Sequence, residues 1–82
     1  MTREEILQTI TDILRDILQQ PALAITEQTT ADQVERWDSI NHVNILMTVE
    51  RTFKIRFSLG EIKKLRNVGE MVMLVETKTG SK

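Results

Sequence analysis

The sequence contains no cysteine and no tyrosine, and it has a single histidine. Without cysteine there is no disulfide framework, no thiolate metal site and no cysteine nucleophile, and one histidine cannot build a histidine-rich metal site. Aromatic side chains are also scarce, because only Trp37, Phe53 and Phe57 are present. Aliphatic residues must therefore supply most of the core, and in so short a chain helices with local contacts form one most easily.

An excess of charge of one sign is also missing. The 11 basic residues stand against 12 acidic ones, which gives a net charge of −1. A nucleic-acid-binding domain needs a surplus of Lys and Arg on one face, so nucleic acid is not an expected partner. The charge is unevenly distributed, since residues 1–50 hold nine acids and three bases and residues 51–82 hold three acids and eight bases. This division indicates either solvated faces of opposite sign or a polarised surface that selects partners.

Long hydrophobic runs are absent as well. The longest uninterrupted apolar run is Met71 to Val75, far below the roughly 20 residues of a membrane-spanning helix. The N-terminus, Met1 to Glu5, lacks the basic start and apolar run of a secretory signal. We therefore expect a cytoplasmic protein without membrane contact, with a single domain over residues 1–78 and a flexible tail at 79–82.

The first helix is predicted from Thr2 to Gln20. Thr2 and Glu5 have the spacing of a capping box, and Pro21 disfavours helical backbone at the residue before it. Between these limits apolar residues recur at steps of three and four, which indicates one wide helical stripe. The stripe consists of Ile6, Ile10, Ile13 and Ile17, with Leu7, Leu14 and Leu18 beside it.

Residues 21–38 show no sustained period and are predicted to form a long ordered loop with one short turn. A connection of roughly 17 residues is unusual in a compact domain and is more often functional than idle. A second helix is predicted from Ser39 to Phe53, with Asp38 as its N-cap. Its expected core-facing residues are Ile40, Val43, Met47 or Leu46, and Phe53.

Two more helix starts follow in the sequence. Ser58 with Glu61, and Asn67 with Glu70, have capping-box spacing. The first pair opens a short helix that uses Leu59, Ile62 and Leu65, and the second opens a last helix with the stripe Val68, Met71, Val72 and Val75. The predicted fold class is therefore all-α: a bundle of three main helices plus one short helix, with the long loop between the first two helices.

Ser39 is the main candidate functional residue. A serine in the first turn of a helix exposes its hydroxyl beside unpaired backbone N–H groups and the positive end of the helix dipole, which favour an attached or bound phosphate. On its own, Asp38-Ser39 is more typical of a simple helix cap. His42 lies on roughly the same face and either contacts the phosphate, tunes docking, or is only a partly exposed polar residue. Trp37 either anchors a partner or packs the helix entry onto the core.

The region around Ser39 resembles the modification-site helix and following loop of the acyl carrier protein family. The likeness extends over nearly the whole chain, and Ile40 stands where leucine is more usual. It is carried by Asp38-Ser39-Ile40, by the apolar period through Val43, Leu46 and Met47, by Glu50, and by Phe53-Lys54-Ile55-Arg56-Phe57-Ser58.

This resemblance implies that the Ser39 hydroxyl is esterified by 4′-phosphopantetheine, which a separate magnesium-dependent phosphopantetheinyl transferase takes from coenzyme A. The sulfur that carries acyl groups as thioesters then arrives with the cofactor. Asp38 would cap the helix and help the transferase place its metal, whereas the chain itself would hold none. Ile40 and Val43 would border the site. The protein would be a monomeric carrier, not an enzyme, that meets acyl-loading and acyl-transferring enzymes.

The second helix departs from the fatty-acid type of carrier, in which it is dense in Asp and Glu. Here the polar positions are nearly neutral, and neutral surfaces select different partners. We therefore expect a dedicated partner set in a specialised lipid, polyketide or surface-polymer pathway. The expected docking residues are Ile40, His42, Val43, Asn44 and Arg51.

Three other functions remain open at this point. An aminoacyl or peptidyl carrier would use the same serine. A small helical interaction domain without a prosthetic group would use Asp38-Ser39 only as a cap and present basic residues such as Lys63, Lys64 and Arg66. A small enzyme would use Ser39 as a nucleophile, although the sequence shows no base paired with it.

Overall fold

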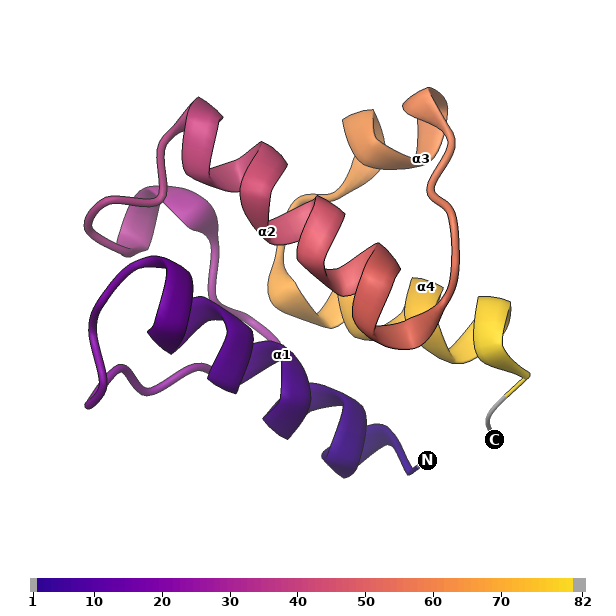
Figure 1. The fold of residues 1–82 in the computed structure, drawn as a ribbon, viewed down its shortest axis with the longest axis horizontal. Helices are drawn as coiled ribbons and strands as arrows, with labels where there is room; N and C mark the ends of the chain where they lie inside the picture. The colour runs from indigo at the N-terminus through magenta and orange to yellow at the C-terminus, as the bar shows by residue number, and fades with distance from the viewer. Residues whose placement is uncertain (1, 81–82) are drawn as a thin grey trace.

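A computed structural model describes residues 2–80 of the protein (Figure 1). Within that range it contains helices and loops but no strand. This confirms the predicted all-α class, with three main helices and one short one. The α-helices are α1 (Arg3–Ile17), α2 (Ser39–Phe53), α3 (Leu59–Lys64) and α4 (Val68–Thr79), and the loop between α1 and α2 contains the single 3₁₀ turn η1 (Ala31–Gln33).

Two of the three predicted capping boxes are confirmed. The Thr2 hydroxyl accepts a hydrogen bond from the Glu5 N–H, and the Glu5 carboxylate accepts one from the Thr2 N–H. Ser58 and Glu61 exchange the same pair of bonds at the start of α3. Each box satisfies two N–H groups that the helix itself leaves unpaired. The positions of α1 and α3 in the sequence are therefore fixed by local chemistry.

The third predicted box, at the start of α4, is only half formed. The Asn67 side chain accepts from the Glu70 N–H, but the Glu70 carboxylate accepts from the N–H of Arg66 and not from that of Asn67. The backbone at Asn67 is more extended (φ −149°) than at Thr2 and Ser58 (φ −78° and −79°). The N–H of Arg66, and not that of Asn67, therefore faces the Glu70 carboxylate.

The first helix ends earlier than predicted. α1 ends at Ile17 and is closed by the buried Leu18, because Gln19 adopts a left-handed conformation (φ 53°) that turns the chain out of the helix before Pro21. At the other end of the chain, α4 continues to Thr79 and Gly80 follows in a left-handed conformation (φ 73°). Thr79, which the sequence placed in a flexible tail, is thus helical, and positions 81 and 82 of that tail lie outside the described residues.

The core lies where α1 packs against α2 and α4. The predicted stripe of α4 is confirmed, since Val68, Met71, Val72 and Val75 are all buried. The fully buried residues of the α1 stripe recur at every fourth position, whereas Ile13 and Ile17 are only half-buried. The fully buried residues are Ile6, Ile10 and Leu14, followed by Leu18 at the cap. Trp37 and Phe57 close the core from the segments that flank α2.

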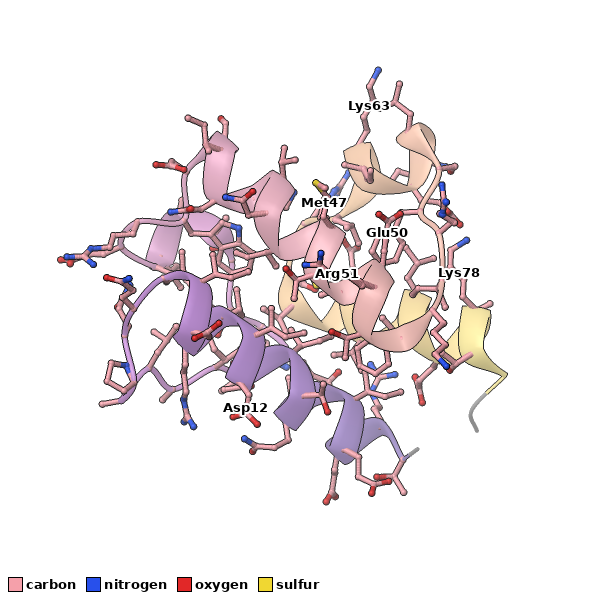
Figure 2. All side chains as sticks on the ribbon, viewed as in Figure 1. Asp12, Met47, Glu50, Arg51, Lys63 and Lys78 are labelled. Carbon is pink, nitrogen blue, oxygen red and sulfur yellow. The ribbon has the colours of Figure 1, made fainter. Side chains whose placement is uncertain are left out.

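The predicted core-facing residues of α2 are partly wrong. Ile40, Val43 and Met47 are 75%, 54% and 55% exposed, and Figure 2 shows Met47 on the side of α2 away from α1. The buried residues of α2 are Ile45, Leu46 and Val49, with Phe53 half-buried. α2 has apolar side chains on two faces, so periodicity alone could not decide which face meets α1. Leu59 of α3, also predicted to pack inward, is 69% exposed.

The long loop is fastened to the start of α4. The N–H groups of Val68 and Gly69 donate to the carbonyls of Thr29 and Glu27 at 2.9 and 2.8 Å. The Glu27 carboxylate also binds the guanidinium of Arg3, which reaches Glu76 of α4 as well. These contacts hold the loop, although it has almost no regular structure of its own. No helix in residues 2–80 is long and apolar enough to cross a membrane.

Candidate functional site

The site is built on the first turn of α2. Asp38 has an extended backbone (φ −93°, ψ −175°), its carboxylate accepts from the Asn41 N–H at 2.9 Å, and its carbonyl accepts from the His42 N–H at 2.8 Å. Asp38 is thus the N-cap, as predicted. Within residues 2–80, the N–H groups of Ser39 and Ile40 have no protein acceptor. Two free donors at the positive end of α2 therefore flank the exposed Ser39 hydroxyl.

The chain that leads into α2 is held in a fixed bend. Arg36 has a left-handed backbone (φ 68°), which is uncommon for a residue with a side chain. Its carbonyl accepts a hydrogen bond from the side-chain amide of Asn41 at 2.7 Å, so α2 itself stabilises the bend. Trp37 follows and is only 9% exposed, which agrees with its core-packing role. Packing and hydrogen bonds on both sides of Ser39 thus determine where its hydroxyl lies.

Trp37 and His42 form a hydrogen-bonded pair beside the serine. The indole Nε1–H donates to Nδ1 of His42 at 3.0 Å, with the ring centroids 6.1 Å apart. Burial lowers the pKa of the half-buried His42 below its ordinary value. An Nδ1 that accepts from tryptophan cannot also hold a proton, so the bond favours the neutral imidazole with its proton on Nε2. His42 is therefore a half-buried structural partner of Trp37.

We expect the Trp37→Phe variant to raise the pKa of His42. Phenylalanine keeps most of the apolar contact but cannot donate, so it removes the bond that favours the neutral ring. The pKa is measured by following the imidazole protons by NMR as the pH is lowered, and an unchanged pKa would contradict the role of the bond. In the wild type the folded-state pKa lies below the ordinary value of 6.5, so the stability from neutral His42 is complete above that pH and decreases as pH falls below it.

A surface cavity of about 600 Å³ opens next to Ser39. It brings together the start of α2, the turn η1 and the segment after α3, and its lining includes both members of the Trp37–His42 pair. The residues that line it are Ala31, Asp32, Trp37, Asp38, Ser39, His42, Val43 and Leu65. A cavity of this kind, with an apolar wall and a few polar groups beside an exposed hydroxyl, suits a flexible chain attached to that hydroxyl.

The structure brings together only some of the predicted site residues. Asp38, Ser39, His42 and Val43 share the cavity, and Ile40 is exposed beside it. The predicted docking residues Asn44 and Arg51 are exposed further along α2 and do not line it. Leu65, Ala31 and Asp32 also line the cavity but were not predicted, because they come from other segments of the chain and carry no local signal.

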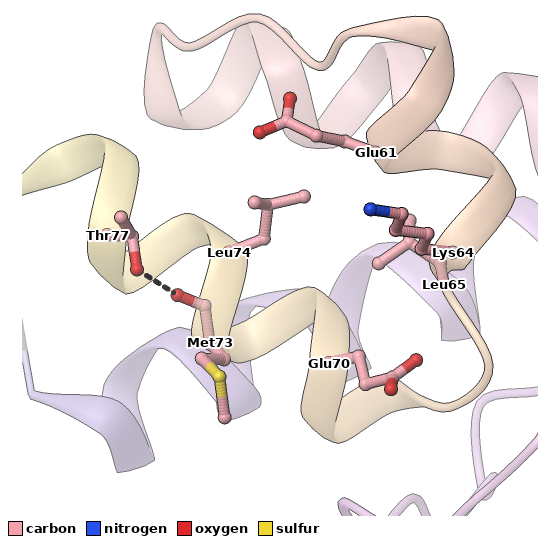
Figure 3. A pocket seen from close by; sticks show the side chains of 7 residues that line it. All are labelled: Glu61, Lys64, Leu65, Glu70, Met73, Leu74 and Thr77. Atoms are coloured by element: carbon pink, nitrogen blue, oxygen red, sulfur yellow. Dashed lines mark hydrogen bonds between the residues drawn. The ribbon is translucent and has the colours of Figure 1, made fainter.

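A second cavity, of about 270 Å³, lies between α3 and α4 (Figure 3). Leu65, the C-cap of α3, and Leu74 of α4 line this cavity. An ion pair between Glu61 and Lys78, at 3.0 Å, joins α3 to α4 nearby. Its lining residues include no member of α2, so Ser39 does not line this cavity.

The geometry argues against catalysis by Ser39 itself. No hydrogen bond in the described part of the chain involves its hydroxyl, and Nδ1 of His42 is occupied by Trp37. An activated serine needs a base within hydrogen-bonding reach. Residues 2–80 also contain no group of three or more His, Cys, Asp or Glu side chains placed to hold a metal ion.

The chain is similar to known proteins that carry a prosthetic group. Residues 8–75 match the family model for the phosphopantetheine attachment site. The chain is 27% identical over 77 residues to an acyl carrier protein of Coprothermobacter proteolyticus, with 94% of each chain covered. It is also similar to the solution NMR structure of the holo acyl carrier protein from Geobacter metallireducens, with a TM-score of 0.85, 36% identity, and 90% of this chain and 85% of that chain covered.

The chain therefore belongs to the acyl carrier protein family. It is a carrier protein and not an enzyme, and its prosthetic group is phosphopantetheine. As a member of this family it works with a phosphopantetheinyl transferase and with acyl-handling enzymes. The resemblance noted in the sequence is thus confirmed at the level of family, fold and cofactor.

Proposed function

We propose that the Ser39 hydroxyl is the attachment point of 4′-phosphopantetheine, and that the protein carries acyl groups as thioesters on this arm. The observation that carries the proposal is an exposed serine beside the free N–H groups of Ser39 and Ile40 and at the mouth of the 600 Å³ cavity. In the attachment reaction the serine oxygen forms a bond to the phosphorus of the phosphopantetheine half of coenzyme A. The bond to the nucleotide half breaks, and the hydroxyl proton is lost to the transferase.

The surrounding residues fit such a group. Free backbone N–H groups at a helix N-terminus favour a phosphate, so a phosphodiester on Ser39 would lie in a favourable field. Asp38 holds those donors in place through its cap, and by family analogy it helps the transferase place its metal. The walls formed by Trp37, Val43 and Leu65 offer apolar contact to the arm. The group supplies the thiol that the chain lacks, whereas the chain supplies its position.

The cargo is proposed to come from a specialised lipid, polyketide or surface-polymer pathway. The support is the composition of α2, in which Glu50 is the only acidic residue. A face so poor in carboxylates does not suit enzymes that dock through basic patches, because charge complementarity selects partners. We propose Ile40, Val43, His42, Asn44 and Arg51 as residues that contact the partners. An aminoacyl or peptidyl cargo would use the same attachment chemistry.

The attachment site is tested by mass spectrometry. The protein is incubated with coenzyme A, magnesium and a broad-specificity phosphopantetheinyl transferase, and its intact mass is expected to increase by one phosphopantetheine. Trypsin then cleaves after Arg36 and Arg51, which releases a peptide of residues 37–51 that holds Ser39 and Thr48 as its only hydroxyl-bearing residues. Fragmentation should locate the group on Ser39. A group on Thr48 or on another peptide would overturn the proposal.

A further inference from the structure

The exposed face of α2 carries an apolar strip that begins next to Ser39. Ile40, Val43 and Met47 are each more than half exposed, although they are large hydrophobic residues. Their spacing of three and four places them along one side of the helix. The opposite side of α2 forms the core with Ile45, Leu46 and Val49. The strip is thus not part of the hydrophobic core, and it leads from the proposed attachment site towards the C-terminal end of α2.

A basic groove lies at the far end of this strip. The groove has a volume of about 540 Å³, and Met47 belongs to both the strip and the groove. Arg51 is in the last turn of α2, and Lys54 and Arg56 follow the helix, all three exposed. The residues that line the groove are Met47, Glu50, Arg51, Lys54, Ile55 and Arg56. Its lining therefore includes two apolar side chains, three cations and one carboxylate.

The cations of the groove are not neutralised by the protein itself. In residues 2–80 neither Arg51, Lys54 nor Arg56 forms an ion pair, whereas Arg3, Arg15 and Lys78 do. The carboxylate of Glu50 accepts a hydrogen bond from the Phe57 N–H at 2.7 Å, so it serves the backbone of the following loop. Basic residues at the C-terminal end of a helix are favourable for its dipole, which accounts for Arg51 in the last turn and for Lys54 at the C-cap. Arg56 lies two residues beyond the cap and gains little from that effect.

We propose that the strip and the groove, defined by Ile40, Val43, Met47, Arg51, Lys54 and Arg56, form the docking face for an acyl-handling partner that presents an acidic surface with an apolar contact. The inference rests on the proposed function, because a partner that acts on the arm at Ser39 must approach this face. The charge excludes the reverse polarity, since a basic partner would meet three unpaired cations. Complementary charge chiefly accelerates encounter and rejects wrong partners, so the interaction should weaken with salt.

The test uses two synthetic peptides as probes. One has leucines alternating with glutamates, and the other has the same leucines with lysines. Each is titrated into the isotope-labelled full chain, before and after attachment of phosphopantetheine, and backbone amide shifts are followed by NMR. We expect the acidic peptide to shift amides in residues 40–56, with at least about tenfold weaker binding when NaCl is raised from about 50 to about 500 mM. The basic peptide should leave these amides unchanged.

Matched charge-reversal variants separate this face from overall charge. Arg51→Glu with Arg56→Glu removes two groove cations, and we expect about tenfold weaker binding of the acidic peptide. Lys63→Glu with Lys64→Glu changes the net charge equally but on α3, and Figure 2 shows Lys63 well apart from Arg51. This control should bind the peptide within about twofold of the wild type. Equal weakening in both variants, or shifts outside residues 40–56, would overturn the proposal.

The docking and attachment proposals fail in different ways. The wild-type chain and the Lys63→Glu, Lys64→Glu control keep both Ser39 and the docking face, so in an end-point mass measurement each should gain one phosphopantetheine. Normal attachment with no specific peptide binding would overturn the docking face alone. Peptide binding to the unmodified chain with no attachment to Ser39 would overturn the proposed attachment site and leave a basic docking surface without its carrier role.

Discussion

The Ser39→Ala variant is expected to gain no phosphopantetheine while its free energy of unfolding stays within about 0.5 kcal/mol of the wild type. The Ser39 side chain is exposed, and no hydrogen bond in the described part of the chain involves its hydroxyl. The cap of α2 is formed by Asp38, so the serine is not needed to start the helix. Alanine is also a good helix former. The variant therefore separates chemistry from folding.

Ser58→Ala is the matched control for this prediction. Ser58 caps α3 through its bond to the Glu61 N–H, so its loss should cost about 1 kcal/mol of stability. Attachment of phosphopantetheine should be unaffected, because Ser58 is outside the cavity at Ser39. Intact mass and thermal unfolding are measured for both variants. Full modification of Ser39→Ala would exclude Ser39 as the attachment point, and a large loss of stability would show that it has a structural role.

The sequence predicted those features that depend on near neighbours in the chain. The starts of α1 and α3 follow from Thr2 with Glu5 and from Ser58 with Glu61, because a capping box needs only two residues at a fixed spacing. The bounds of α2 were predicted correctly through Asp38 as its N-cap. The position of Ser39 at the start of α2 is a local feature of the same kind.

Features that depend on tertiary contacts could not be predicted in the same way. The exposed side of α2 contains Ile40, Val43 and Met47, which are as hydrophobic as the residues of the buried side, so only the packing of α1 against α2 decides which side is buried. The cavity wall contributed by Leu65 comes from a segment 26 positions after Ser39. Ile40, Val43 and Met47 were predicted to face the core but are exposed. Large apolar residues that the core does not use are available for contact with partners.

The second prediction with a large effect concerns the contact that holds the long loop. Gly69 is buried, and its N–H donates to the Glu27 carbonyl at 2.8 Å. A Cβ at this position would lie 2.9 Å from that carbonyl oxygen and 3.0 Å from the Glu27 Cβ. Both atoms are held by the loop, and Glu27 is held further by its ion pair with Arg3. The added methyl group can therefore be accommodated only if the loop moves away from α4.

We expect Gly69→Ala to lower the free energy of unfolding by about 1–3 kcal/mol, the usual cost of overpacking, whereas Gly60→Ala should raise it by about 0.5–1 kcal/mol. Gly60 is also helical, but a Cβ there meets nothing within 4 Å, so only the gain in helix propensity remains. Denaturant unfolding measures both changes. Hydrogen exchange should also become faster at the Thr29 amide in Gly69→Ala, because this amide bonds to the Thr26 carbonyl and closes a turn that contains Glu27. Equal free energies of unfolding for Gly69→Ala and Gly60→Ala would mean that the loop adapts freely to the added methyl group. The contact between Glu27 and Gly69 would then not explain how the segment before Ser39 is held.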